Sequence, residues 1–194
     1  MRQVGIILLV VFSMFSLAPG QARAVVAWDE DVDGDLSGDG LAPSSAVLVL
    51  GSNTVTATSV SGDREYLRVT VPAGQALSQL VLNSFSGQDG TAFIAVQSGA
   101  TFTESHIGTD VSNLLGYSHF GPAEGPVPFD YLPILGGSVG AIGFTAPLPS
   151  GDYTFWMQQT GVNATTYQWD LVTIPEPATL GLLLIGGAAV WRRR

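Results

Sequence analysis

The feature that most constrains the fold is that no helical pattern of useful length runs through residues 25–174. Short runs of β-branched and aromatic residues recur instead, and Gly, Pro, Ser and Asn interrupt them. Such runs between turn-forming residues are typical of β-strands. The expected strands are Val47–Leu50, Thr54–Val60, Glu65–Val71, Leu77–Phe85, Ala92–Gln97, Leu114–His119, Ala141–Thr145, Asp152–Gln159 and Thr166–Thr173.

Eight or nine short strands in about 150 residues predict an all-β fold, an antiparallel β-sandwich or jelly-roll-like single domain. Alternation supports this prediction, because Leu67, Val69 and Val71 would share one face of their strand. The run Thr166–Thr173 alternates in the same way. The segment Gly121–Pro133 contains four prolines, and we expect it to be a long loop.

The charge is unevenly distributed along the chain. The formal net charge is −9, yet five of the seven arginines lie in the terminal segments. Residues 25–174 therefore carry two basic and fifteen acidic side chains, a net charge near −13. An acidic surface of this kind repels phosphate backbones, so nucleic-acid binding is excluded. The chain has no Cys, which excludes disulfides, thiolate metal sites and cysteine nucleophiles.

The first 24 residues have the three parts of a secretory signal peptide. Arg2 begins a short basic part, an apolar run extends from Val4 to Ala18, and Ala22 and Ala24 supply the small residues before a cleavage site. We expect signal peptidase to cleave after Ala24. An uncleaved membrane anchor is the alternative, but the apolar run is short and a helix-breaking Pro-Gly follows it.

The last 20 residues join a Pro-Glu-Pro motif to an apolar stretch and a basic end, Arg192, Arg193 and Arg194. Fourteen uncharged residues lie between these two parts; as a helix they would span ~21 Å, less than the ~30 Å hydrocarbon core. Trp191 suits the membrane interface and the arginines can snorkel, so we still expect a membrane helix. Positive flanks remain cytoplasmic, which places the body outside the inner membrane.

This ordered combination resembles the PEP-CTERM sorting signal of Gram-negative bacteria. The residues Pro175, Glu176 and Pro177 match its motif, Leu180–Trp191 its helix, and Arg192–Arg194 its basic tail. The resemblance implies recognition by an exosortase, a membrane-embedded processing enzyme. It also implies release or transfer of the body to the cell exterior, commonly in bacteria that make exopolysaccharide.

Two parts of the body resemble pre-peptidase C-terminal-like β-sandwich domains. One is Ser61–Gly74; the other is Gly151–Phe155, followed after a loop by Tyr167–Leu171. The resemblance implies a jelly-roll-like accessory module of secreted proteins, usually without catalytic activity. We therefore expect four parts in the chain: a signal peptide (1–24), an acidic linker and domain entry (25–45), the β-sandwich (46–174) and the sorting signal (175–194).

Residues 29–39 contain six acidic side chains. The spacing of Asp29, Asp31 and Asp33, with a glycine directly after them, reproduces the first half of an EF-hand-like calcium loop. Position twelve is Gly40, not the bidentate Glu of such loops, and no flanking helices are expected. Two alternatives stay open: a weak Ca²⁺ site with Asp35 as a further ligand, and a solvated acidic turn. No other cofactor is expected.

Candidate catalytic residues lack the context that their chemistry needs. Ser138 lies in a G-x-S-x-G string, but a nucleophile elbow needs a His later in the chain, and both His106 and His119 precede it. Glu104 with the two histidines could form a metal or acid/base cluster, although ordinary loop residues are expected. Fifteen acids leave a glycosidase pair open, yet nothing marks one pair over another. We therefore expect that this chain is not an enzyme.

Trp156 is the candidate ligand-binding aromatic. On Asp152–Gln159 it would occupy the face opposite Tyr153, Phe155 and Met157. A flat indole on this polar face could stack on a sugar ring. The alternative is partial burial under a neighbouring loop or sheet edge.

These observations predict an exported, non-enzymatic surface or extracellular-matrix protein associated with exopolysaccharide and biofilm. The expected partners are signal peptidase and exosortase during processing, the membrane before it, and exopolysaccharide after it. A carbohydrate-binding module is the first alternative, and a secreted hydrolase is the second.

Overall fold

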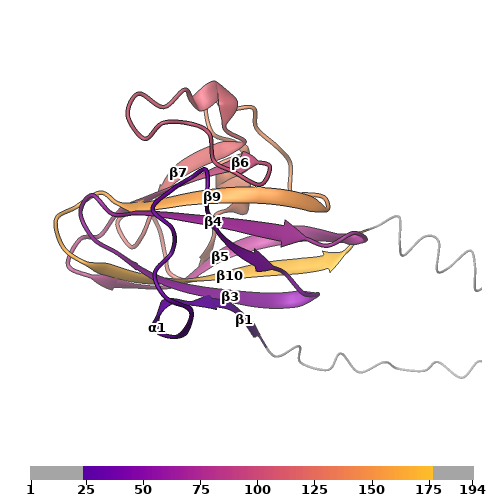
Figure 1. Cartoon of the computed structure of the whole chain (residues 1–194), viewed down its shortest axis with the longest axis horizontal. Helices are drawn as coiled ribbons and strands as arrows, with labels where there is room; N and C mark the ends of the chain where they lie inside the picture. Colours follow the sequence, from indigo (N-terminus) through magenta and orange to yellow (C-terminus); the bar gives the residue numbers. More distant parts are fainter. Residues whose placement is uncertain (1–23, 177–194) are drawn as a thin grey trace, which may run out of the picture.

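The β-branched runs of the body form two β-sheets that pack face to face (Figure 1). The computed structural model describes residues 24–176; the expected signal peptide and the helix Leu180–Trp191 with its arginines lie outside them. The arrangement confirms the expected all-β sandwich. Among the described residues no helix has the length and apolarity needed to cross a bilayer.

Within residues 24–176, each sheet contains five strands. The strands of the first sheet, in spatial order, are β1 (Val25–Asp29), β3 (Gly51–Ser59), β10 (Thr165–Pro175), β5 (Gln75–Gly87) and β8 (Phe129–Asp130). Those of the second are β2 (Ser44–Val47), β4 (Arg64–Val71), β9 (Gly151–Gln159), β6 (Ala92–Ser98) and β7 (Gly116–Phe120). Three short helices connect them: α1 (Glu30–Asp33), the 3₁₀ helix η1 (Val111–Asn113) and α2 (Leu132–Gly136).

Neighbouring strands are antiparallel except at one edge of each sheet. There β1 pairs parallel with β3, and β2 pairs parallel with β4. β1 lies within residues 25–45 and β2 begins within them, so the segment that we expected to be an acidic linker and domain entry contributes strands to the sandwich. Leu36, which is 2 % exposed, joins the core from this segment, and Ser37 bridges to Tyr66 of β4.

Some expected strands differ from those in the structure. The strand expected at Val47–Leu50 lies earlier, as β2, and the one expected at Leu114–His119 is β7, which begins two residues later. The segment Ala141–Thr145 is not a strand. Positive φ angles at Gly140 and Gly143 break its extended conformation, and its backbone N–H groups bond to loop carbonyls instead. The expected loop Gly121–Pro133 contains β8 and the start of α2.

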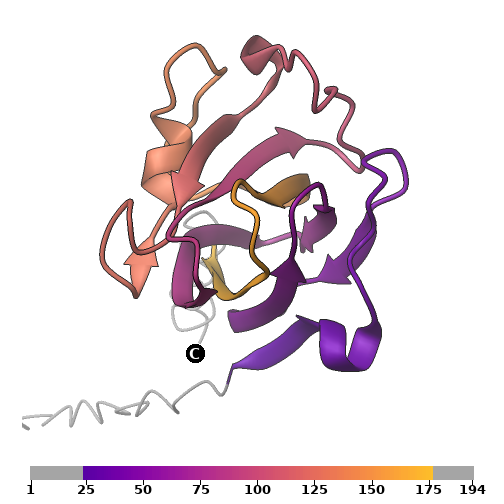
Figure 2. The same ribbon diagram turned by 90° about the vertical axis from the view of Figure 1, so that its left-hand side faces the viewer.

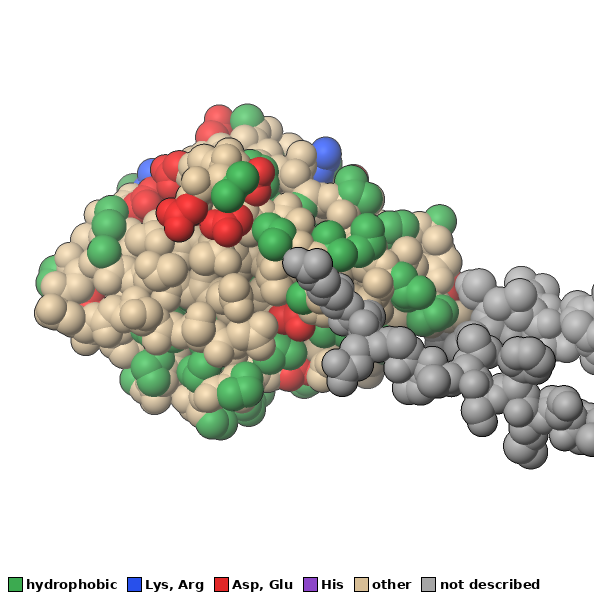
Figure 3. Space-filling view, turned by 90° about the horizontal axis from the view of Figure 1, so that it is seen from below, with side chains coloured by type: hydrophobic (Ala, Val, Ile, Leu, Met, Phe, Trp, Pro, Cys, Tyr) green, Lys and Arg blue, Asp and Glu red, His purple; other side chains and the backbone are tan. Residues whose placement is uncertain are grey.

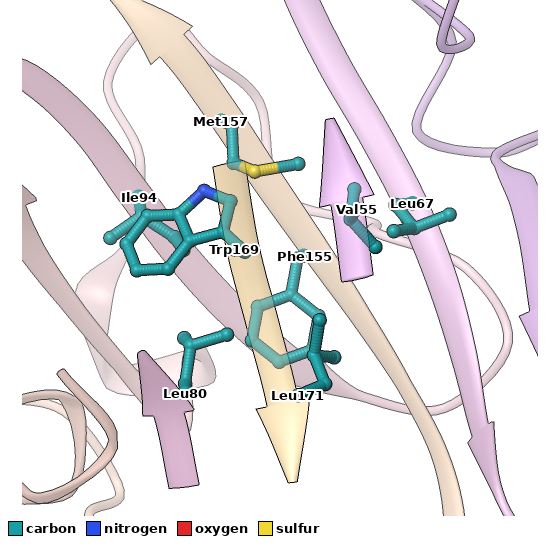
Figure 4. A pocket seen from close by; sticks show the side chains of 8 residues that line it. All are labelled: Val55, Leu67, Leu80, Ile94, Phe155, Met157, Trp169 and Leu171. Atoms are coloured by element: carbon teal, nitrogen blue, oxygen red, sulfur yellow. The ribbon is translucent and has the colours of Figure 1, made fainter. Parts of the chain in front are cut away.

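The core lies between the two sheets. Alternate residues of β4 and β10 point into it, as the sequence predicts, and Trp169 is its largest fully buried side chain. The ring of Phe120 lies 4.8 Å from that of Trp169 and 5.3 Å from that of Tyr167, measured between ring centroids. Side chains from both sheets meet at the middle of the sandwich, as Figure 4 shows for Val55, Leu67, Leu80, Ile94, Phe155, Met157, Trp169 and Leu171.

The first and last strands leave the domain at the same end. Val25 of β1 and Leu171 of β10 both pair with Asn53 of β3, one on each side. The helix α1 and the start of β4 lie at the opposite end, which Figure 2 views directly, with α1 in indigo. Both terminal segments therefore attach to one end of the sandwich.

One carboxylate faces the core. Glu65 is an inward residue of β4, its exposed fraction is 0 %, and neither carboxylate oxygen has a hydrogen-bond partner among the described residues. Burial of the side chain raises the pKa of Glu65 to about 10, and the nearby carboxylate of Asp63 contributes to this rise. A carboxyl group with this environment is unusual inside a sandwich, because an unpartnered buried charge destabilises the folded state.

We expect Trp169→Ala to lower the free energy of unfolding by about 3–5 kcal/mol, because it removes the largest side chain of the core and leaves a cavity. Urea unfolding of residues 25–176 measures this change. The control is Thr166→Val on the exposed side of the same strand, which should shift stability by no more than about 0.5 kcal/mol. Equal effects of the two substitutions would contradict the assignment of the core.

We also expect stability to fall with rising pH through Glu65. Its folded pKa is raised, so its contribution to stability is complete below the unfolded pKa, about 4.3, and is lost as the pH rises toward about 10. The substitution Glu65→Gln should flatten this slope between pH 5 and 9 in a chelating buffer. Asp31→Asn, at an exposed acid, should leave the slope as in the unmodified chain. Urea midpoints at pH 5, 7 and 9 test this, and parallel slopes for E65Q and the unmodified chain would refute it.

Candidate functional site

The four aspartates of the expected calcium loop are not arranged as one loop. Asp29 is the N-cap of α1: its Oδ1 accepts from the backbone N–H of Asp31 at 3.2 Å. Asp33 Oδ2 accepts from the backbone N–H of Asp29 at 2.9 Å. These contacts form one turn of helix over residues 30–33. The carboxylates of Asp29 and Asp33 are thus used in local hydrogen bonds, and calcium binding by the four aspartates stays a prediction.

Only Asp35 of those four joins a close group of carboxylates. One ligand oxygen each from Asp35, Glu30 and Glu65 lies within 4.8 Å of the other two. Figure 3 shows acidic side chains gathering on one part of the surface, over the position of α1. Sequence analysis missed Glu30 and Glu65. The alternation of β4 was the available signal for Glu65, because it has the same parity as Leu67 and Val69.

Trp156 does not offer an open face to a sugar. It is 5 % exposed and belongs to a second hydrophobic cluster on the outer side of β9. Its ring centroid lies 6.1 Å from Tyr66, 5.7 Å from Phe102 and 5.0 Å from Phe93. The chain after β6 folds back over this face, so the sugar-stacking role expected for Trp156 is wrong and the alternative, burial under a neighbouring loop, is what the structure has.

The hydroxyl of Ser138 is surrounded by backbone hydrogen-bonding groups. Its Oγ accepts from the backbone N–H of Tyr117 at 2.9 Å and lies 2.6 Å and 2.7 Å from the carbonyl oxygens of Tyr117 and Leu135. The hydroxyl thereby joins α2 to β7. In the described part of the chain only glycines have positive φ, so Ser138 lacks the strained turn of a nucleophile elbow.

The other candidate polar residues divide between two depressions. Glu104 and His106 line one of about 290 Å³, where Glu104 accepts from the backbone N–H of Asp110 and the side-chain amide of Asn113. His119 lines another, so the cluster of Glu104 and two histidines is not assembled.

The depression at His119 is an open groove of about 400 Å³ beside β7. We call it the β7 groove; it is lined by Tyr117, Ser118, His119, Glu124, Ile134, Gly137, Ser138 and Val139. Tyr117 and His119 are two residues apart on one face of the strand, and both flank Phe93, at centroid distances of 6.5 Å and 5.8 Å. An aromatic strip thus borders the groove. Sequence analysis missed it, although the i, i+2 spacing of Tyr117 and His119 was visible.

The sorting segment begins inside the fold. Pro175 ends β10 opposite Gln75, and the backbone N–H of Glu176 donates to the carbonyl of Gly74 at 2.9 Å. The carboxylate of Glu176 accepts from the backbone N–H of Ser150 at 3.2 Å. The first two residues of the Pro-Glu-Pro motif are therefore bound to the sandwich without a linker, while Pro177 and the basic tail lie outside the described residues.

Comparison with known proteins gives a match to one family model and matches to solved structures. The model of the PEP-CTERM protein-sorting motif matches residues 173–194. No curated protein matches the chain. One of these structures is PliG of Aeromonas hydrophila, a periplasmic lysozyme inhibitor of g-type lysozyme, with 13 % identity and a TM-score of 0.32. The alignment covers 66 % of this chain and 95 % of PliG.

These comparisons do not confirm the expected relationship of the body to pre-peptidase C-terminal-like domains. The sorting motif implies export and a C-terminal membrane anchor before cleavage. The chain is an exported protein that carries the PEP-CTERM signal of an exosortase substrate.

Proposed function

We propose that this chain is a non-enzymatic surface or extracellular-matrix protein whose β domain binds exopolysaccharide through the β7 groove. The observation that carries this proposal is the composition of the groove: the half-exposed ring of Tyr117 and the exposed imidazole of His119 lie beside hydroxyl and carboxylate groups. Sugar rings have apolar C–H faces and polar hydroxyl edges, and binding sites for them need both kinds of surface. Because Trp156 is buried, we assign sugar stacking to Tyr117 and His119 instead.

The shape of the molecule favours a polymer over a small ligand. The groove is open and lies at an edge strand, whereas the space between the sheets is filled by apolar side chains (Figure 4). A chain of sugars can lie across an open groove with its ends in solvent. The net charge near −13 of residues 25–174 favours neutral or cationic polysaccharides over anionic ones.

The non-enzymatic part of the proposal draws on the surroundings of the candidate catalytic groups. The hydroxyl of Ser138 is engaged by backbone groups of Tyr117 and Leu135. The ring of His119 packs edge-on against Phe93. Glu124 accepts from the hydroxyl of Thr91 at 3.0 Å. The hydroxyl of Ser138 and the carboxylate of Glu124 are thus engaged by other groups of the fold, which supports a structural role for both.

We expect Tyr117→Ala and His119→Ala each to weaken binding of the producing organism's own exopolysaccharide about 3–10-fold, as expected for loss of one stacking contact. Co-sedimentation or isothermal titration with the purified polysaccharide measures this effect. Val47→Ala, at an exposed position on the opposite edge of the same sheet, is the matched control and should leave affinity unchanged.

The same samples separate binding from hydrolysis. Reducing-end release from the polysaccharide should stay at the level of the buffer. Binding that is equal in the groove variants and in the control would overturn the groove assignment. Release of sugar that Glu124→Gln abolishes would instead make the protein a hydrolase.

We expect the mature protein to begin at Val25 and to end beyond Ile174 without the tail Arg192–Arg194. The reason is that both ends carry removable targeting patterns, whereas residues up to Pro175 are paired in β10. Intact-mass measurement on protein from native cells decides the point. A mass that includes the arginine tail would contradict exosortase processing, and a mass ending before Ile174 would mean that β10 is cut.

A further inference from the structure

We infer that Glu30, Asp35 and Glu65 form a Ca²⁺-binding site at the end of the sandwich opposite the sorting signal. The three side chains come from the start of α1, from the turn after it and from the start of β4. One carboxylate oxygen of each lies within 4.8 Å of the others, a spacing that a single ion can bridge. The site differs from the loop of aspartates that the sequence suggests, with which it shares only Asp35.

The buried side chains around this group point to a ligand. Glu65 is 0 % exposed, and both of its oxygens lack a hydrogen-bond partner among the described residues. The hydroxyl of Tyr167 is also fully buried and without a partner there. Buried polar groups are normally paired, since each unpaired one costs free energy. A cation between the carboxylates removes this cost for Glu65.

Acidic side chains are concentrated at this end of the sandwich. Asp63 lies beside Glu65, so four acidic groups are close together with Glu30 and Asp35. Like charges at such distances repel, and burial strengthens the repulsion because the local dielectric constant is low. A divalent cation converts this repulsion into attraction and joins the N-terminal segment to β4.

The ligand set selects a hard cation. All three ligands are carboxylates, and the group contains neither imidazole nor thiolate, the ligands that zinc and other transition metals favour. Mg²⁺ keeps several of its waters, whereas Glu65 offers a water-excluded position. Ca²⁺ accepts six to eight oxygens in irregular geometry, so water on the exposed side of the site, at Asp35, would complete its shell.

Local hydrogen bonds fix the position of the Glu30 carboxylate. Its carboxylate accepts from the backbone N–H groups of Leu36 and Thr58, and this anchors the turn after α1 against β3. Next to it, the backbone N–H of Tyr66 donates to the carbonyl of Ser37 at 2.8 Å. Glu30 and Glu65 thus lie on parts of the chain that the sandwich fixes, which reduces the ordering that binding must impose.

The test is a CaCl₂ titration of the full chain, purified in detergent and freed of metal, followed by its melting temperature. Extracellular modules bind Ca²⁺ with dissociation constants of ~10⁻⁴–10⁻³ M, so ~10 mM should saturate the site. We expect a rise of about 5–10 °C near saturation. Glu65→Gln and Asp35→Asn should abolish or strongly reduce the rise, and Asp31→Asn, an exposed acid of α1, should keep it whole.

Each other outcome overturns the inference. An unchanged melting temperature of the unmodified chain would leave Glu65 as a protonated core residue. A response that D31N abolishes and E65Q keeps would place calcium on the aspartate loop. An equal response to MgCl₂ would exclude selection of Ca²⁺. If E65Q fails to fold, D35N decides, because Asp35 is exposed and its amide leaves the core intact.

Discussion

The packing of the two sheets through their inward side chains is the interaction on which the rest of the structure depends. The ring centroid of Trp169 lies 4.8 Å from that of Phe120, on the edge strand β7, and 5.6 Å from that of Tyr131, just before α2. One ring of the core thus contacts both an edge strand and a connecting segment. Burial of large apolar side chains supplies most of the stability of such a domain. The α1 segment and the β7 groove keep their geometry because the strands that carry them are fixed by this core.

Side chains on a strand alternate between its two faces, and this alternation made much of the core predictable. Burial of Leu67, Val69 and Trp169 follows from alternation, since neighbouring side chains on a strand point to opposite faces. Strand boundaries were less predictable. Ala141–Thr145 has the composition of a strand, but positive φ at Gly143, and at Gly140 just before the segment, is a property of the folded backbone that residue type alone does not fix. β1 was missed because its acidic end and short length resemble a linker.

The sites depend on long-range contacts and were harder to predict. Trp156 lies on the outer face, as alternation requires, yet a later segment covers that face, and no local pattern shows this. Tyr117 borders a groove only because Ser138 ties α2 to its strand. Glu65 follows a turn in the sequence and looks like a surface charge, whereas the strand register turns it inward. In each case the contacting residue is distant in sequence. Alternation indicated that Glu65 faces inward, but spacing did not show which side chains it meets.

The continuity of β10 with the sorting motif links folding to presentation of the signal. Pro175 pairs with Gln75, the first residue of β5. Glu176 bonds to Gly74, directly before β5, and to Ser150, directly before β9. These contacts exist only when the sheet is formed, so a folded body holds the start of the motif at a fixed place at its end. An unfolded body would instead leave the motif in free chain. The register of β10 therefore couples the position of the sorting motif to the folded state of the body, and the carboxylate group around Glu65 lies at the far end of the same domain.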